Sequence, residues 1–300
     1  MQLHQLRALV AVADAGSISA AARALHLSQP ALTRSLKQLE IEVGASLLRR
    51  TRQGVTLTEC GQALLLHARL IASEVDDARQ HVSQLAGNRS GQLAVASSAV
   101  PFTLIVPQAV AIMRRRFPDV YLRLHEAVYP PVLELFRQQM LDFALGPLPQ
   151  SGLGEEYRCD PLFELDLVVA ARRDHPQAHA NSLRQLADWQ WIITGPLHGP
   201  GAVHETAFRQ AGFRPPLCAM HCEATGCALQ ILEQSDLLSF VPRRLAEQER
   251  DAGRLAIIDI REDIPSLQIA LFLPARKILS PAGQALYSAI HSVSRGLYRG

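Results

Sequence analysis

The stretch from Ser28 to Glu42 carries side chains that could contact nucleic acid. Ser28 stands where a helix N-cap belongs, and Pro30 falls in the first turn, where its missing N–H is not needed. Apolar residues recur at spacings of four, three and four, which predicts the buried face of a helix: Leu32, Leu36, Leu39 and Val43. The opposite face has no acid and carries amide, hydroxyl and cationic groups: Ser28, Gln29, Pro30, Thr33, Arg34 and Lys37. Such groups contact base edges and phosphates in a major groove, so we interpret this helix as a recognition helix.

Neighbouring elements are expected to position the recognition helix. The apolar periodicity predicts a helix over Leu3–Ala13, and Ser17 is placed to cap a second helix over Ile18–Ala24. A short turn then leads into the recognition helix, which is the arrangement of a helix-turn-helix. After Gly44, the sequence Leu47–Leu57 predicts a small β-ribbon. The tip of this ribbon carries two cations that could press on phosphates or enter a minor groove: Arg50 and Arg52.

Residues 1 to about 60 closely resemble the winged helix-turn-helix head of LysR-type transcriptional regulators. The resemblance rests on the pattern AAxxLxxSQPALTRxLxxLExxxGxxLLxRxxxGVxLTxxG, which is far more specific than a lone helix-turn-helix. Leu36 and Leu48 stand where the family often has Ile and Phe, and both are core exchanges of similar character. The resemblance implies that Gln29, Thr33 and Arg34 approach bases, and that the two cations of the ribbon tip meet the backbone or minor groove.

Charge is unevenly distributed along the chain. Residues 1–58 contain seven Lys+Arg and three Asp+Glu, whereas the remaining residues contain 23 Lys+Arg and 25 Asp+Glu. The head therefore carries a formal charge of +4 and the body a charge of −2. A basic head on a near-neutral body indicates that only the head meets a polyanion, and we expect double-stranded DNA as that partner.

A long helix is predicted to follow the head. Thr58 stands at its N-cap, and apolar residues then alternate spacings of four and three over about three heptads: Leu64, Ala68, Ile71, Val75, Ala78, Val82 and Leu85. So narrow a seam favours a partner helix, because packing on the same domain usually needs a wider stripe. The LysR resemblance implies dimerisation through this segment, so we expect a homodimer or homotetramer. Gly87–Gly91 would end the helix as a flexible joint.

From Gln92 onward, strand-like and helix-like stretches alternate. Strands are predicted at 93–97, 120–125, 142–145, 165–170, 191–194, 237–241, 255–260 and 268–273, and helices at 103–117, 131–140, 202–211 and 281–294. This alternation is typical of parallel sheets covered by helices. The resemblance implies two α/β subdomains that enclose an effector, as in periplasmic binding proteins. The two crossovers between them are expected near Pro161–Leu167 and Pro265–Ile269.

The predicted fold class is therefore α/β with an all-α winged helix-turn-helix head, a long linker helix and a two-subdomain effector domain. The head would span residues 1–58, the linker 59–87, the hinge 88–91 and the effector-binding domain 92–300. Within the last, subdomain I would consist of 92–161 and 268–300, and subdomain II of 162–267.

Small and polar residues follow several predicted strands. In open α/β sheets, ligands bind beyond the carboxyl ends of the strands, where helix N-termini offer N–H groups. The candidate effector residues are Ser97, Ser98, Phe102, Tyr129, Gly146, Thr194, Gly195, His198, Gly201 and Thr225. Each alone is more often a cap or turn residue, but together they suit a small anion, aromatic or bearing a carboxylate or sulfonate. Two short patches also look similar to regulators of aromatic-sulfonate catabolism: Tyr129–Leu145 and Gly199–Ala202.

Motifs of catalysis are absent from the sequence. It contains no GxSxG, Walker A, HExxH or strand-preceded GxGxxG, so we expect no enzyme and no cofactor. Three cysteines gather around His221 with a spacing that fits no zinc finger: Cys218, Cys222 and Cys227. Some LysR-type regulators sense peroxide through a cysteine pair in this region, so a redox-sensing regulator using Cys222 and Cys227 stays open as an alternative. We favour the interpretation that the three cysteines are small, buried apolar side chains. No Lys or Arg lies between Arg214 and Arg243 to lower the pKa of a thiol there.

The remaining features concern compartment and class. No signal peptide is evident, and no window approaches the roughly 18–20 apolar residues of a membrane span, so we expect a cytoplasmic protein without a membrane partner. Five cysteines, an odd number, do not indicate a disulfide framework. The competing class is a small-molecule-binding or enzymatic α/β protein whose head serves only assembly.

Overall fold

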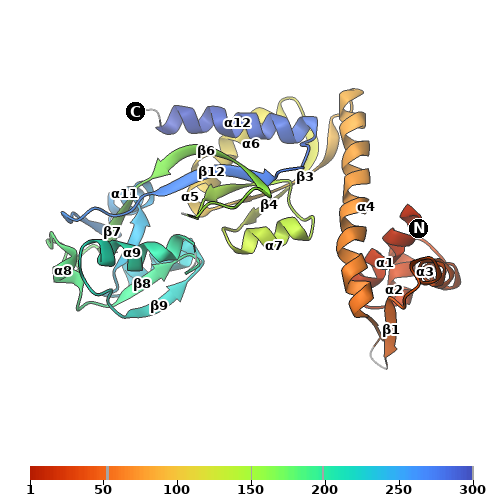
Figure 1. The fold of residues 1–300 in the computed structure, drawn as a ribbon. Helices are drawn as coiled ribbons and strands as arrows, with labels where there is room; N and C mark the ends of the chain where they lie inside the picture. Colours follow the sequence, from red (N-terminus) through yellow and green to blue (C-terminus); the bar gives the residue numbers. More distant parts are fainter. Residues whose placement is uncertain (52–53, 150, 198, 299–300) are drawn as a thin grey trace. The chain divides into compact units, whose positions relative to one another are not determined.

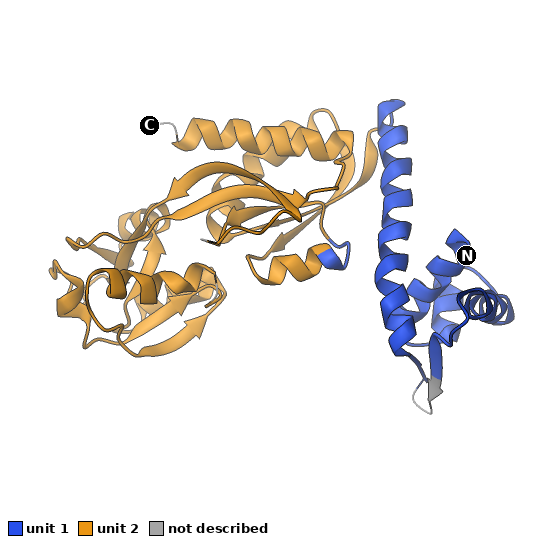
Figure 2. Ribbon diagram, in the orientation of Figure 1, with its two compact units in different colours: residues 1–88, 137–140 blue, residues 89–136, 141–300 orange. Residues whose placement is uncertain are grey.

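A computed structural model describes residues 1–51, 54–149, 151–197 and 199–298 (Figure 1). The chain divides into two compact units, residues 1–88 with 137–140 and residues 89–136 with 141–300 (Figure 2). In the described ranges, no helix combines the length and the apolar character needed to cross a membrane.

The first unit contains helices around a small apolar core and a two-stranded antiparallel ribbon. Its elements are α1 (Leu3–Ala15), α2 (Ile18–Ala24), α3 (Gln29–Val43), β1 (Leu48–Thr51), β2 (Gly54–Leu57) and α4 (Glu59–Leu85). The core is formed mainly by Leu6, Leu9, Val12, Leu32, Leu36, Leu39 and Leu47. Gly16 ends α1 with φ 62°, a conformation that favours glycine, and Ser17 then caps α2 by accepting the N–H of Ala20.

Helix α4 is anchored to the rest of the first unit at its start. The Thr58 hydroxyl accepts the N–H of Gly61 at 3.0 Å. A Cβ at Gly61 would lie 2.1 Å from the carbonyl oxygen of Leu47, so only glycine allows this approach of helix to ribbon. Two ion pairs join α4 to α1: Arg7 with Asp76, and Arg69 with Asp14.

The second unit contains two lobes. The first lobe consists of β3 (Ser90–Ser97), α5 (Ala99–Leu104), α6 (Val106–Arg114), β4 (Asp119–Glu126), α7 (Pro131–Arg137), β5 (Phe143–Pro147), β6 (Tyr157–Leu165), β12 (Leu267–Pro274) and α12 (Pro281–Tyr298). The second lobe consists of β7 (Leu167–Arg172), α8 (Leu183–Leu186), β8 (Trp191–Thr194), the short 3-10 helix Pro200–Ala202, α9 (Val203–Gln210), β9 (Cys218–Cys222), α10 (Thr225–Glu233), β10 (Ser239–Pro242), α11 (Arg243–Asp251) and β11 (Leu255–Ile258). The chain passes between the lobes twice, from β6 to β7 and from β11 to β12.

A five-stranded mixed sheet forms the first lobe, in the order β4-β3-β5-β12-β6. Successive side chains of a strand point to opposite faces. Strand β12 therefore contributes Ile269, Leu271 and Leu273 to a core with α6 and α12, and Phe272 to a core with α7. Because both faces of β12 are buried, its sequence is almost continuously apolar.

The second lobe has an antiparallel sheet, β10-β7-β11, and a parallel pair, β8-β9. Strand β7 is again buried on both faces, with Val169 in a core under α8 and α9 and Val168 in a core under α10. Fully buried Trp191 centres the first of these cores. Its ring centroid lies 5.3 Å from that of Phe208 and 5.0 Å from that of Phe240.

The prediction of parallel sheets is wrong for much of the second unit. In the first lobe, β3 pairs in parallel with β4 and β5, but β12 pairs antiparallel with β5 and β6. In the second lobe, β7 pairs antiparallel with β10 and β11. The cause in the first lobe is the return of the chain from the second lobe, because β12 enters the sheet in the opposite direction.

Two predicted elements are each divided in the structure. The strand predicted at 165–170 is two strands in different sheets, β6 and β7, separated by Asp166. Sequence reasoning missed most of β6 because it contains Pro161; the strand tolerates proline as a sheet edge whose register shifts opposite Ile269 and Ala270. The helix predicted at 103–117 is α5 and α6, broken because the ring of Pro107 prevents a continuous helix.

Candidate functional site

Helix α3 has the boundaries of a well-capped helix. The Ser28 hydroxyl accepts the N–H of Ala31 at 3.3 Å, and Gly44 ends the helix with φ 72°. The apolar face is buried in the core of the first unit through Leu32, Leu36 and Leu39. Val43, predicted on the same face, is 41% exposed because the last turn of α3 extends beyond that core.

The outward face of α3 is polar and cationic. Ser28, Gln29, Pro30, Arg34 and Lys37 are exposed, and Thr33 is half-buried. The Gln29 side-chain oxygen accepts a hydrogen bond from the Ser19 hydroxyl at 3.0 Å, which holds this amide at the start of the helix. Neither Arg34 nor Lys37 forms an ion pair with another described residue. Both cations are therefore available to an external anion.

The ribbon is fastened to α3 by a carboxylate that sequence reasoning missed. Glu40, in the last turn of α3, accepts the N–H of Leu47 at 2.8 Å and of Leu48 at 3.2 Å. An acid near a helix C-terminus is unfavourable without a specific partner, and that signal could have identified it. The Arg50 side chain and Arg52, the predicted tip cations, lie outside the described residues.

The predicted dimerisation seam of α4 separates into two parts. Ala68 is fully buried, and Leu64 packs on the same core of the first unit. A partner role for Ala68 is therefore wrong, because the first half of α4 completes the core of its own head. Further along, Val75 is half-buried and the remaining members are exposed: Ile71, Ala78, Val82 and Leu85. Val82 and Leu85 are 68% and 71% exposed, which leaves an uncovered apolar stripe in the first unit.

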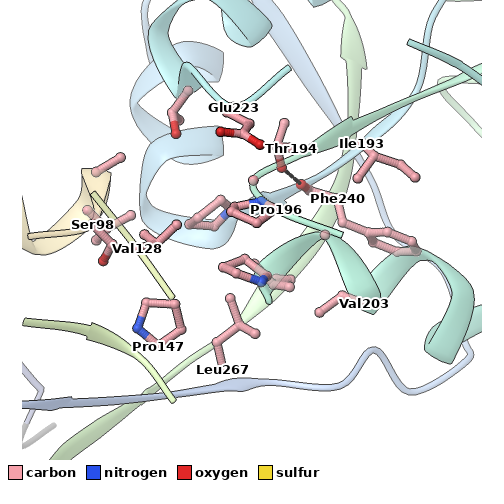
Figure 3. A pocket seen from close by; sticks show the side chains of 18 of the residues that line it. Ser98, Val128, Pro147, Ile193, Thr194, Pro196, Val203, Glu223, Phe240 and Leu267 are labelled. Carbon is pink, nitrogen blue, oxygen red and sulfur yellow. Dashed lines mark hydrogen bonds between the residues drawn. The ribbon is translucent and has the colours of Figure 1, made fainter. Parts of the chain in front are cut away.

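A cavity of about 440 Å³ lies in the second unit, lined by residues of both lobes. In Figure 3, Ser98, Val128 and Pro147 lie on one side of the cavity, and Ile193, Thr194 and Phe240 lie on the other. Most of the wall is apolar. The size and the character of the wall suit a small organic molecule.

The structure brings half of the predicted effector residues to this cavity. Its wall includes Ser98, Thr194, Gly195, Gly201 and Thr225. Thr194 is held in place because its hydroxyl donates to the carbonyl of Phe240 at 3.3 Å. A Cβ at Gly201 would lie 2.7 Å from the carbonyl oxygen of Gly195, so glycine is needed for the tight turn there.

The other predicted effector residues are not in the described wall. The Ser97 hydroxyl is buried and donates to the carbonyl of Ser98 at 3.1 Å. Gly146 packs against Ser98, since a Cβ at Gly146 would lie 3.5 Å from the Ser98 side chain. Phe102 donates its N–H to the Ser98 carbonyl at 2.9 Å. Tyr129 contributes backbone packing, since a Cβ at Gly199 would lie 2.7 Å from its carbonyl oxygen. His198 lies outside the described residues.

Two glutamates that sequence reasoning missed lie in the cavity wall. Glu126 is the last residue of β4, and Glu223 directly follows β9 and precedes α10. Two carboxylates in the wall do not favour the small anion that the sequence led us to expect. Glu126 could have been found from the sequence, because it stands at the end of a predicted strand. No such signal existed for Glu223, because β9 was not predicted.

His204 in α9 is the remaining polar group of interest in the wall. Its ring packs among aromatic neighbours, with centroids 5.3 Å from Trp191 and 5.5 Å from Phe208. Burial lowers the pKa of His204 below its ordinary value, which favours the neutral ring. Its Nε2 atom is buried without a hydrogen-bond partner in the described part of the chain.

The three clustered cysteines are not the buried residues that were expected. Cys218 and Cys227 are exposed, and Cys222 is half-buried. For the two cysteines of β9 the expectation is wrong because, among the described strands, β9 pairs only with β8 and one side of it stays in solvent. Cys227 lies instead on an exposed part of α10. A hydrogen bond with Cys222 raises the pKa of the Cys227 thiol. Within the described ranges, no group of His, Cys, Asp and Glu is arranged to hold a metal ion.

Family models match both units of the chain. The model of the LysR substrate binding domain matches residues 86–295, and the model of the bacterial regulatory helix-turn-helix protein, lysR family, matches residues 3–62. The SDS degradation transcriptional activation protein of a Pseudomonas species is 30% identical, over 96% of this chain and 95% of that protein. The RuBisCO operon transcriptional regulator of Allochromatium vinosum is 29% identical, over 95% of this chain and 94% of that protein.

Solved structures share the fold at lower identity. CbnR in complex with its target DNA matches with a TM-score of 0.68 and 22% identity, over 98% of this chain and 100% of that chain. ArgP of Mycobacterium tuberculosis matches with a TM-score of 0.69 and 22% identity, over 99% of this chain and 98% of that chain. Similarity at this level of identity concerns the fold alone.

Proposed function

This chain belongs to the LysR family of transcriptional regulators, and from that premise we propose that it binds operator DNA as a homo-oligomer and responds to a small molecule held in the cavity of its second unit. The recognition helix α3 and the ribbon would contact DNA, and the exposed part of α4 would contact a second copy. We place this activity in the cytoplasm, where bacterial DNA is found.

The observation that carries the DNA-binding role is the outward face of α3. Arg34 and Lys37 are exposed cations without a described ion-pair partner, on a face without acids. A cation that is not paired internally can displace counterions from a phosphate or donate to a guanine edge. Glu40 supports the same role, because it holds the ribbon against α3 in a fixed relation.

The exposed apolar stripe of α4 supports the oligomeric state. Val82 and Leu85 would lose most of their exposed surface in a helix pair, and burying a side chain of this size is worth about 1.5–3 kcal/mol. Domain boundaries at 58, 87 and 91 would then separate the DNA-binding head, the linker helix, the hinge and the effector-binding domain.

The competing class was an enzyme or binding protein whose head serves only assembly. The named relatives are transcriptional regulators, and this chain is a regulator rather than an enzyme. We do not carry over control by an aromatic sulfonate, because the described cavity wall holds no lysine or arginine to pair with a sulfonate.

A mobility-shift assay with DNA from upstream of the chain's own gene tests the proposal. We expect specific binding that a small molecule alters. The substitution Val128→Trp should fill the cavity and abolish the response to the molecule while leaving unliganded DNA binding intact. Ala111→Trp, on the exposed surface of α6, is the matched control and should respond as wild type. An unchanged response in Val128→Trp would remove the cavity from the proposal.

The oligomeric part is tested separately by light scattering. Val82→Glu would place a carboxylate within the proposed helix pair, which should lower the oligomer mass and weaken DNA binding. Gln62→Glu introduces the same charge at an exposed position of α4 outside the stripe and should leave the mass unchanged. An unchanged mass in Val82→Glu would mean that oligomerisation uses another surface.

A further inference from the structure

The cavity wall carries negative charge without compensating positive charge. Glu126 belongs to the first lobe and Glu223 to the second, so each lobe supplies one carboxylate. No lysine or arginine is present among the described lining residues. A bound anion would meet two like charges and no cation, and its charge would be destabilised.

Both carboxylates are unpaired within the described ranges. Both side chains are exposed, and neither forms a hydrogen bond or ion pair with another described residue. Arg243 follows the lining residue Pro242, but it lines a separate cavity together with Glu164 and Asp166. The nine-residue helix α10 does not offer a free positive end either, because Glu223 already stands before its first turn.

His204 provides an independent sign that the cavity receives a polar ligand. The residue is 6% exposed and lines the cavity, and its Nε2 atom has no partner in the described part of the chain. Buried polar atoms are almost always hydrogen-bonded, and a polar group entering the cavity could supply the partner that the described residues leave out. The rest of the wall is largely apolar, with Val128, Ile193 and Phe240 among its members.

We propose that the effector is a small organic cation, an ammonium group on an apolar body, whose charge is held by Glu126 and Glu223. This inference rests on the proposed function and specifies the ligand of the same cavity. An ammonium carries three N–H donors and no acceptor, which matches two acceptor-only carboxylates. The apolar body would occupy the remaining wall, with a polar substituent able to meet His204.

Benzylamine, benzyl alcohol and benzoate form a probe set with one shared ring and three head-group charges. Titration calorimetry on the full chain at low ionic strength should give benzylamine an affinity at least about tenfold higher than benzoate. Glu126→Gln and Glu223→Gln should each reduce this preference several-fold. Glu155→Gln, an exposed position outside the cavity wall, should leave it unchanged. Higher salt should also reduce the preference.

The outcomes separate the charge of the ligand from the role of the cavity. Benzylamine binding that Val128→Trp abolishes, with the stated preference, supports the proposal. Benzoate or benzyl alcohol binding in the cavity as tightly as benzylamine would overturn the charge assignment and leave the proposed function standing. Benzylamine binding that survives in Val128→Trp, or no benzylamine binding, would also overturn it. Unfolding curves of both Glu→Gln variants identify any loss that comes from misfolding.

Discussion

The outward face of α3 and the wall of the cavity carry charges of opposite sign. The helix face presents Arg34 and Lys37 with no acid beside them, whereas the cavity wall presents Glu126 and Glu223 with no described lysine or arginine. Both sets are left unpaired by the described protein. The same chain therefore presents a surface suited to a polyanion and a separate cavity suited to a cation, and neither ligand class competes for the other site.

The two surfaces also differ in how they are assembled. The helix face comes from one continuous segment and needs only a correctly capped helix. The cavity wall comes from segments between Ser98 and Ile269, brought together by two sheets and two crossings between lobes. Substitutions that damage one unit should therefore leave the binding surface of the other unit intact.

The largest effect is expected from a substitution in the aromatic core of the second lobe. Trp191→Ala should destabilise the second unit by about 3–5 kcal/mol, because a fully buried ring is lost from a packed aromatic cluster. Chemical denaturation followed by circular dichroism measures this loss, and ligand binding should fall with it. Trp189→Ala, at a half-buried position, should cost much less. Equal losses for the two variants would contradict the described core.

A smaller effect is expected from damage confined to the head. Gly61→Ala should destabilise the first unit by about 1–3 kcal/mol, because the new Cβ would clash with the Leu47 carbonyl oxygen. DNA binding should weaken while ligand binding in the second unit is retained. Gly226→Ala in α10 is the control, because a Cβ there meets nothing within 4 Å. If Gly61→Ala binds DNA and unfolds as wild type does, the close approach of α4 is wrongly described.

Removing one cation from the outward face of α3 tests the role of its positive charge. Arg34→Ala should cost about 1–3 kcal/mol of operator affinity and relax specificity at one base position. The dependence of DNA affinity on salt, measured by fluorescence anisotropy, should also become shallower. Arg250→Ala removes an exposed cation from α11 and should change neither quantity. Retained operator discrimination in Arg34→Ala would refute the recognition-helix assignment.

The smallest expected effect concerns acid stability of the second unit. Burial lowers the pKa of His204 in the folded chain, so the unfolded chain binds more protons as the pH falls below the ordinary value of 6.5. The free energy of unfolding should therefore keep its full value above pH 6.5 and should decrease as the pH falls below 6.5. His204→Phe keeps a ring in the cluster and should reduce this decline, while buried His175, whose pKa burial also lowers, keeps part of it.

Thermal unfolding at pH 7 and pH 5 measures that decline. His179→Phe, at an exposed position of the same lobe, serves as the control and should follow the wild type. If His204→Phe and wild type show the same pH dependence, the pKa of His204 is not lower in the folded chain than in the unfolded chain.

Local features of the first unit were predictable because they depend on near neighbours in sequence. Ser28, Gly44 and the spacing of Leu32, Leu36 and Leu39 fix α3 through capping and periodicity alone. Where a distant contact decides the outcome, prediction failed. Ala68 belongs to the predicted seam by periodicity, yet it is buried because α4 packs against α1.

The second unit shows the same limit more strongly. The rule that ligands bind beyond strand ends predicted Ser98 and Thr194 as effector residues, and both line the cavity. Glu223 escaped because the strand before it pairs only with β8, and its sequence around Cys218 does not alternate. His204 escaped because its burial depends on Trp191 and Phe208, which packing across the lobe brings to it.

The two connections between the lobes are unequal in length. The first is the single residue Asp166, whose carbonyl oxygen accepts the N–H of Arg243 at 2.9 Å, whereas the second runs through residues 259–266. A connection of one residue offers only the two backbone dihedral angles of that residue, whereas the longer second connection offers many more. Any change in the relative orientation of the two lobes must therefore be accommodated within the backbone at Asp166 as well as in residues 259–266.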